Sequence, residues 1–177
     1  MQLIDNFYNE DEWIKVNALL NTMKFTPTCQ PEDNTIDNRL KGYPCYETKK
    51  QPSLDFLKEI LLGALKRNTM YNINNLDTSF RKIYTKELEK SPAISHSSIH
   101  KDTNIKMAGV VYFNGLTIKG GTSLYFNKNM STQFEPDVIY AARPNRAVLY
   151  DSQIFHCANH DYAYDVRTIQ TIFFDYA

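Results

Sequence analysis

The second half of the sequence is a succession of short runs rich in β-branched and aromatic residues, separated by turn residues. An alternating stretch, SFRKIYTKEL, begins near residue 78, and further runs occupy residues 107–113, 122–126, 137–142, 146–151 and 167–174. Asn-Gly, Lys-Gly-Gly and Pro-Asn sequences lie between these runs, and such residues favour tight turns. Many short strands at this spacing are typical of a sandwich or barrel of antiparallel strands.

Two helices are predicted before these strands. Asn9 is suited to cap the first helix, and the acidic residues 10–12 would lie in its first turn, where the helix dipole favours negative charge. Apolar residues follow at helical spacing: Trp13, Val16, Leu19, Leu20 and Met23. Ser53 is suited to cap a second helix that ends near Asn68. Its apolar face would consist of Leu54, Leu57, Ile60, Leu61, Ala64 and Leu65.

The length of 177 residues fits one domain. Leu3 and Ile4 suggest a short opening strand, and residues 26–52 contain four of the seven prolines, which indicates an irregular connection. We therefore expect a single, mainly β domain over residues 1–177. Residues 1–77 would supply helical support and loops and residues 78–177 the β core, with the helices packed against one sheet.

Composition excludes several classes of protein. No apolar stretch is long enough to span a membrane, and the acidic start MQLIDNFYNEDEW is unlike a signal peptide, so a cytoplasmic location is expected. The three cysteines, Cys29, Cys45 and Cys157, form no CxxC pair and are expected to be reduced thiols. Twenty basic residues balance twenty acidic ones, which disfavours nucleic acid as a partner.

A candidate metal site is contained in the sequence His100-Lys101-Asp102. In an extended chain, His100 and Asp102 point to the same side and could bind one ion together. His156 directly follows the apolar run that ends in QIF and could supply the third ligand; His160, in the polar stretch ANHDY, is the alternative. Two histidines and one carboxylate form a facial triad that binds Fe(II) and leaves the remaining coordination positions open.

Arg167 begins a strand in which Arg167, Ile169, Thr171 and Phe173 alternate onto one face. Its guanidinium could grip one carboxylate of a ligand whose other end chelates the metal. Tyr112 could add a second hydrogen bond to that carboxylate, and Thr171 could share the pocket. Two plainer roles remain open at this point: a structural ion pair for Arg167 and core packing for Tyr112.

These motifs together resemble a known family. The order is HKD, AGVVYFNG, KGGTSLYF, PNRAVLYDSQIFH and then the strand that starts at Arg167, and the opening LIDNFYNEDEW is also similar. The chain resembles the Fe(II)/2-oxoglutarate-dependent oxygenases, in particular the prolyl-hydroxylase-like branch with its small bacterial and phage relatives of unassigned substrate. The resemblance implies a double-stranded β-helix, or jelly-roll barrel, buttressed by two or more helices.

The resemblance also implies roles for individual residues. His100, Asp102 and His156 would bind Fe(II). Arg167 and Tyr112, with Thr171 as a neighbour, would bind the distal carboxylate of the cosubstrate 2-oxoglutarate. Gly120 and Gly121 would shape a turn rather than act chemically. Ile169 departs from branches that carry Ser at this position, so the distal carboxylate would depend on Arg167 and Tyr112.

The implied function is that of a dioxygenase that hydroxylates a peptide side chain, such as proline, or an amino-acid-like small molecule. Its partners would be 2-oxoglutarate, dioxygen and that substrate, with ascorbate as a supporting reductant, in a monomer or small homo-oligomer. Residues 26–52 and 127–136 would form the mouth that sets specificity. A cupin-like metal-binding protein without oxygenase activity and a nucleobase-oxidising member of the superfamily are the alternatives.

Overall fold

A computed structural model describes residues 1–28, 44–48, 51–89, 99–102, 104–126 and 135–177 of the chain. Its helices are α1 (Glu10–Thr22), α2 (Ser53–Asn68), the short α3 (Thr85–Glu89) and the 3-10 turn η3 (Ile118–Gly120). Its strands are β1 (Gln2–Ile4), β2 (Thr26–Pro27), β3 (Cys45–Glu47), β4 (Ile73–Tyr84), β5 (Met107–Tyr112), β6 (Thr122–Tyr125), β7 (Val138–Tyr140), β8 (Arg146–Asp151), β9 (Phe155–Ala158) and β10 (Val166–Tyr176).

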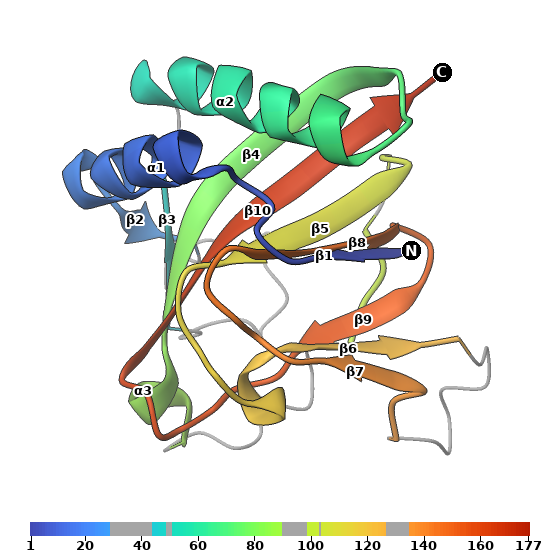
Figure 1. The fold of residues 1–177 in the computed structure, drawn as a ribbon. Helices are drawn as coiled ribbons and strands as arrows, with labels where there is room; N and C mark the ends of the chain where they lie inside the picture. The colour runs from blue at the N-terminus through green and yellow to red at the C-terminus, as the bar shows by residue number, and fades with distance from the viewer. Residues whose placement is uncertain (29–43, 49–50, 90–98, 103, 127–134) are drawn as a thin grey trace.

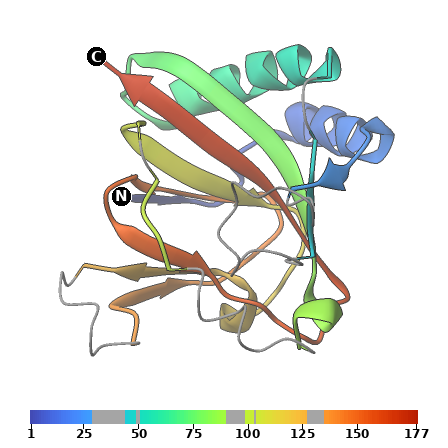
Figure 2. The ribbon, with the colours of Figure 1, turned by 180° about the vertical axis from the view of Figure 1, so that it is seen from behind.

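The strands form two antiparallel sheets, and the helices α1 and α2 cover the larger one (Figure 1). The seven-stranded sheet has the order β1-β8-β5-β10-β4-β3-β2, and the three-stranded sheet has the order β7-β6-β9. The view from behind shows the small sheet on the side of the large sheet that lies away from the two helices (Figure 2). The expected antiparallel β architecture with supporting helices is therefore confirmed.

The two faces of the large sheet build two separate cores, because successive side chains of a strand point to opposite faces. On the helix side, Met107, Val111, Leu149, Ile172 and Phe174 pack with the apolar residues of α1 and α2. On the other side, Ala108, Val110, Tyr112, Val148, Tyr150 and Ile169 pack with Leu124 of the small sheet. We call this second side the inner face; it carries the residues of the candidate site.

The first helix begins as predicted, but the second does not. Asn9 and Glu12 form a reciprocal capping box at the start of α1. The expectation that Ser53 caps α2 is wrong: Ser53 is the first helical residue, and Pro52 precedes it with helical backbone angles and no side-chain cap. Since the proline ring fixes φ near its helical value, the helical turn is already under way before Ser53.

The strand boundaries differ from the expected ones in two places. β4 starts at Ile73 rather than near residue 78, and the polar, exposed residues Asn74, Asn75 and Asp77 in its first part hid the strand pattern. β9 was not expected as a strand; it is a short strand at the edge of the small sheet. In addition, β1, β2 and β3 join the large sheet, so the first 77 residues contribute strands as well as helices and loops.

Some expectations fall on residues outside the described part of the chain. These are Cys29 and most of the two proposed mouth segments, of which residues 29–43, 49–50 and 127–134 are not described. Cys45 and Cys157 are both buried, and no disulfide joins them. None of the helices in the described ranges has the length and apolar character that a membrane crossing requires.

Candidate metal centre and anion clamp

The backbone brings His100 and His156 together, although they lie far apart in the sequence. The N–H of His100 donates to the carbonyl of His156 at 3.0 Å, and the N–H of His156 donates to the carbonyl of His100 at 2.9 Å. The N–H of Asp102 donates to the carbonyl of Ser152 at 3.1 Å. Residues 100–102 therefore run beside the edge strand β9, in a register fixed by main-chain bonds.

One ligand atom from each of His100, Asp102 and His156 lies within 4.8 Å of the other two. His156 Nε2 is 3.3 Å from one carboxylate oxygen of Asp102, and His100 Nε2 is 3.7 Å from the other. The residues that sequence spacing predicted as a triad are thus brought together. His160, the alternative third ligand, is not part of this cluster.

The ring of His156 is oriented by a carbonyl group. Its Nδ1 lies 2.9 Å from the oxygen of Ile154, and because a carbonyl only accepts, Nδ1 carries a proton and donates. Nε2 then faces the Asp102 carboxylate. This nitrogen can carry a proton that it donates to the carboxylate, and a metal ion can take the place of that proton between the two groups, so the donor set fits a metal ion.

Asp102 is held in the charged form that a metal ligand needs. Burial tends to raise the pKa of its carboxyl group, but the hydrogen bond from His156 and the positive charges of His156, His100 and Arg81 outweigh burial and lower the pKa. The side chain of His100 is 56% exposed, whereas those of Asp102 and His156 are 19% and 7% exposed. The cluster is therefore open to solvent on the side of His100.

Arg167 is a buried cation on the inner side of β10. Its Nε donates to the carbonyl of Gly120 at 3.3 Å and its Nη2 donates to the carbonyl of Gly121 at 3.2 Å. No carboxylate in the described part of the chain pairs with it, which removes the structural ion pair as its role within those residues. A buried guanidinium with only neutral partners favours an external anion.

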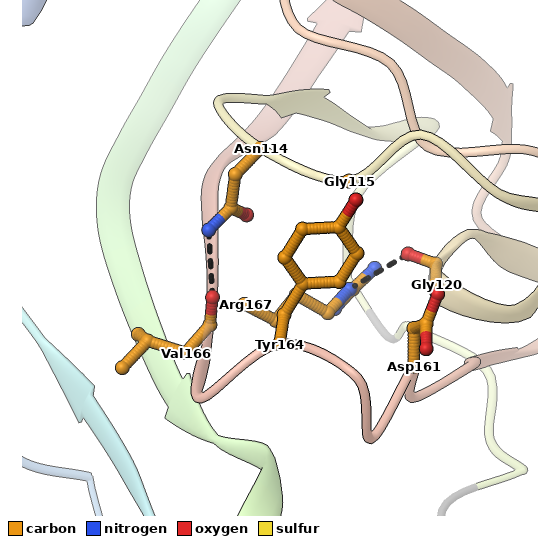
Figure 3. Close-up of a pocket in the computed structure, with 7 residues that line it drawn as sticks. All are labelled: Asn114, Gly115, Gly120, Asp161, Tyr164, Val166 and Arg167. Carbon is orange, nitrogen blue, oxygen red and sulfur yellow. Dashed lines mark hydrogen bonds between the residues drawn. The ribbon is translucent and has the colours of Figure 1, made fainter.

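The two glycine carbonyls fix the plane of this guanidinium and leave Nη1 and the remaining N–H of Nη2 for a ligand. Figure 3 shows Arg167 in a small pocket beneath the ring of Tyr164, with the bond to Gly120 drawn. Asn114, Gly115, Gly120, Asp161, Tyr164, Val166 and Arg167 line this pocket. The guanidinium is thus held in place in the wall of this pocket.

Tyr112 lies beside Arg167 on the same face of the sheet. The Arg167 Cζ atom is 5.7 Å from the centroid of the Tyr112 ring, and the Tyr112 hydroxyl is 2.6 Å from Thr122 Oγ1. Burial raises the pKa of Tyr112 despite opposing contributions from Arg167 and Thr122, so the phenol keeps its proton. Tyr112 also packs in the inner core. Core packing and hydrogen-bond donation are therefore compatible roles for this side chain.

Comparisons with known proteins agree with the architecture. The sequence matches neither a protein-family model nor a curated protein, but solved structures match over nearly its whole length. A prolyl hydroxylase from Trichoplax adhaerens, in complex with a hypoxia inducible factor peptide fragment, is 16% identical with a TM-score of 0.61, over 98% of this chain and 82% of that one. The chain has the fold of the 2-oxoglutarate–Fe(II) oxygenases.

Two further oxygenase-fold structures support this. HygX from Streptomyces hygroscopicus, with nickel, 2-oxoglutarate and hygromycin B bound, is 10% identical with a TM-score of 0.60, over 99% of this chain and 82% of its own. A member of the 2OG-Fe(II) oxygenase family from Burkholderia pseudomallei is 11% identical with a TM-score of 0.58, over 98% and 82% of the two chains. At these identities the likeness establishes the fold.

Two further residues were singled out from the sequence: Thr171 as a neighbour of the clamp and His160 as the alternative metal ligand. Thr171 shares the face of Arg167, but its hydroxyl bonds to the hydroxyl of Ser79 at 3.0 Å and to the Ser79 carbonyl at 3.3 Å. It is therefore engaged with β4. Burial, together with the charge of Arg167, lowers the pKa of His160 to about 3, so this imidazole is neutral and lies near the clamp.

Sequence reasoning missed three contributions to the site. The carbonyls of Gly120 and Gly121 accept hydrogen bonds from Arg167, whereas the sequence predicted only a turn for these glycines. The carbonyl of Ile154 orients His156. The ring of Tyr150 packs against His156, with ring centroids 4.6 Å apart. Only Tyr150 has a sequence signal, because the alternation of the run RAVLYD puts it on the same face as Val148.

Proposed function

We propose that the protein is an Fe(II)- and 2-oxoglutarate-dependent oxygenase. The observation that carries the proposal is the cluster of His100, Asp102 and His156, in which the Ile154 carbonyl orients the His156 ring and Nε2 faces the Asp102 carboxylate. Two neutral imidazoles and one carboxylate are the ligand set of non-haem Fe(II) oxygenases. The two sheets would be those of a double-stranded β-helix, and residues 1–177 would form one oxygenase domain.

The residues of the chain have separate tasks in this proposal. His100, Asp102 and His156 would hold the metal on one side and leave its open positions facing the solvent-exposed side of His100. Arg167 and Tyr112 would bind the distal carboxylate of 2-oxoglutarate through charge-assisted hydrogen bonds. When bound, Fe(II) and 2-oxoglutarate would supply the oxidising chemistry with dioxygen.

Tyr112 can donate its O–H to that carboxylate only if it does not donate the same hydrogen to Thr122. Thr122 Oγ1, 2.6 Å away, can be the donor in that pair. The O–H of Tyr112 can then point toward the clamp, beside the N–H groups of Arg167 that do not bond to the glycine carbonyls. Ile169 fills the adjacent inner position with an apolar side chain, so Arg167 and Tyr112 would carry recognition of the carboxylate together, without Thr171.

For the substrate we propose a peptide side chain, such as proline, or an amino-acid-like small molecule. Prolyl hydroxylases among the structures of the same fold support the first. HygX with hygromycin B bound supports a small molecule. The expected transformation is hydroxylation, because the carboxylate ligand Asp102 is present.

The experiment is a comparison of metal-loaded wild-type protein with D102A and, as a matched control, D11A. Asp11 is an exposed carboxylate of α1 outside the site. Wild-type and D11A protein should bind 2-oxoglutarate and, with Fe(II), ascorbate and dioxygen, form succinate, whereas D102A should do neither. Metal binding without 2-oxoglutarate binding or succinate formation would instead identify a cupin-like metal protein.

A further inference from the structure

Tyr150 stands on the inner face of β8 at the level of the metal cluster. It lies opposite Ala108 of β5, and only 3% of its surface is exposed. Its ring contacts the imidazole of His156 at 4.6 Å between centroids, with a 52° angle between the planes. The side chain therefore forms part of the wall behind one of the proposed metal ligands.

The hydroxyl of Tyr150 differs from those of the other buried tyrosines that the structure describes. Tyr8 donates to Gln170 at 2.8 Å, Tyr112 pairs with Thr122 at 2.6 Å, and Tyr125 pairs with Cys157 at 3.4 Å. No described residue forms a hydrogen bond with the hydroxyl of Tyr150. The protein does not fully enclose this hydroxyl, so its unused O–H is open to a ligand.

Charged groups of both the metal cluster and the clamp act on the phenol of Tyr150. Burial is the main factor that raises its pKa; Asp102 and Tyr112 raise the pKa further, and Arg167 and Arg81 oppose them. The phenol thus feels both the carboxylate of the metal cluster and the guanidinium of the clamp. A phenol hydroxyl is a hydrogen-bond donor, so it can donate to a ligand there.

We propose that the Tyr150 hydroxyl donates a hydrogen bond to the keto oxygen at the metal-chelating end of the 2-oxo acid. This inference rests on the proposed function and deepens it by assigning a third protein donor to the cosubstrate. The chelating end is chosen because Tyr150 contacts His156, whereas Arg167 and Tyr112 already serve the distal carboxylate. Tyr150 is thereby a specificity residue for 2-oxo acids over simple dicarboxylates.

The test is the substitution Tyr150→Phe, which keeps the ring against His156 and removes only the hydroxyl. Calorimetry on Mn(II)-loaded protein should give 2-oxoglutarate binding about fivefold to tenfold weaker than wild type, because the hydrogen bond to the keto oxygen is lost. Affinity for Mn(II) should not change. Affinity for glutarate, which has both carboxylates and no keto group, should also stay the same.

Tyr125→Phe is the matched control, since Tyr125 is a buried tyrosine whose hydroxyl has a partner in the protein. It should bind 2-oxoglutarate like wild type but unfold at a lower temperature. Ligand-free Y150F should be as stable as wild type, because the hydroxyl that it loses forms no hydrogen bond with the described residues. This second measurement is independent of activity and of metal.

Unchanged 2-oxoglutarate affinity in Y150F would overturn the inference and leave the proposed function standing. Equal weakening of glutarate and 2-oxoglutarate would overturn the assignment to the chelating end. Failure of wild-type protein to bind 2-oxoglutarate at all would remove the proposed function together with the inference. The wild-type measurement therefore separates the two failures.

Discussion

The adjacent glycines before β6 should differ sharply in their tolerance of a side chain. A Cβ atom added at Gly121 would lie 1.6 Å from the carbonyl oxygen and 2.7 Å from the carbonyl carbon of Tyr140. Both are backbone atoms, and they belong to the strand β7 that pairs with β6 next to Gly121. At Gly120 the nearest atom is Asp161 Cβ at 3.3 Å. The clash at Gly121 can be relieved only by displacing a strand, whereas that at Gly120 needs a small shift of one residue.

The expected cost of Gly121→Ala is about 3 kcal/mol, the upper part of the usual range for overpacking. For a chain of this length that corresponds to a loss of roughly 6–12 °C in melting temperature. Gly120→Ala should cost less than about 1 kcal/mol. Thermal unfolding followed by circular dichroism measures both, and chemical denaturation checks that the two variants unfold as cooperatively as wild type.

The same pair of variants tests how the clamp is built. Gly121→Ala should also weaken 2-oxoglutarate binding, because relief of the clash would shift the backbone at residue 121, whose carbonyl is one of the two that orient Arg167. A G121A protein that melts within 2 °C or so of wild type would refute the reasoning, since the strand contact would then be more yielding than the 1.6 Å approach implies. A G120A protein as unstable as G121A would refute it equally.

Three further predictions concern the ligands, the clamp and the first helix. His156→Ala should weaken metal binding more than about 100-fold, whereas His160→Ala should leave metal binding unchanged. Calorimetry with Mn(II) measures both variants. The opposite result would make His160 the ligand. Arg167→Ala should weaken 2-oxoglutarate binding roughly 100-fold through the loss of charge-assisted hydrogen bonds, with unaltered Mn(II) affinity; unaltered 2-oxoglutarate affinity would exclude the clamp. Burial tends to raise the pKa of Glu12, but its hydrogen bonds with Arg67 and the Asn9 backbone lower the pKa overall. A carboxyl group whose pKa is lowered by folding stabilises the protein at a pH above its ordinary pKa. This stabilisation is lost as the pH falls through the pKa of the folded state. Glu12→Gln should therefore cost about 1 kcal/mol at pH 7 and nothing at a pH below that pKa, whereas the exposed control Glu59→Gln should change urea stability at neither pH.

Local patterns predicted those parts of the fold and site that depend on side-chain spacing. The two-residue spacing of His100 and Asp102 correctly indicated that they face one point, and the capping pair Asn9 and Glu12 marked the start of α1. The strand β4 began earlier than expected because Asn74, Asn75 and Asp77 are polar residues on a partly exposed strand, where alternation carries no apolar signal.

Contacts made through the backbone could not be predicted from the sequence. The carbonyls of Gly120, Gly121 and Ile154 orient the two key side chains, and every residue type carries such a carbonyl. Strand alternation could turn Tyr150 inward, but only the tertiary structure brings His156 against its ring. The pairing of β6 with β9 decides which side chains meet there.

The reciprocal main-chain bonds between His100 and His156 have a consequence for how an ion would be captured. Because the polypeptide itself closes the long loop between these two histidines, the loop-closure entropy is lost during folding rather than at the moment of coordination. Chelation should then be reversible without unfolding, unlike in small zinc domains whose folding depends on the metal. Removing the ion with a chelator should leave the circular dichroism spectrum intact, and adding it back should restore the loaded protein without a refolding step.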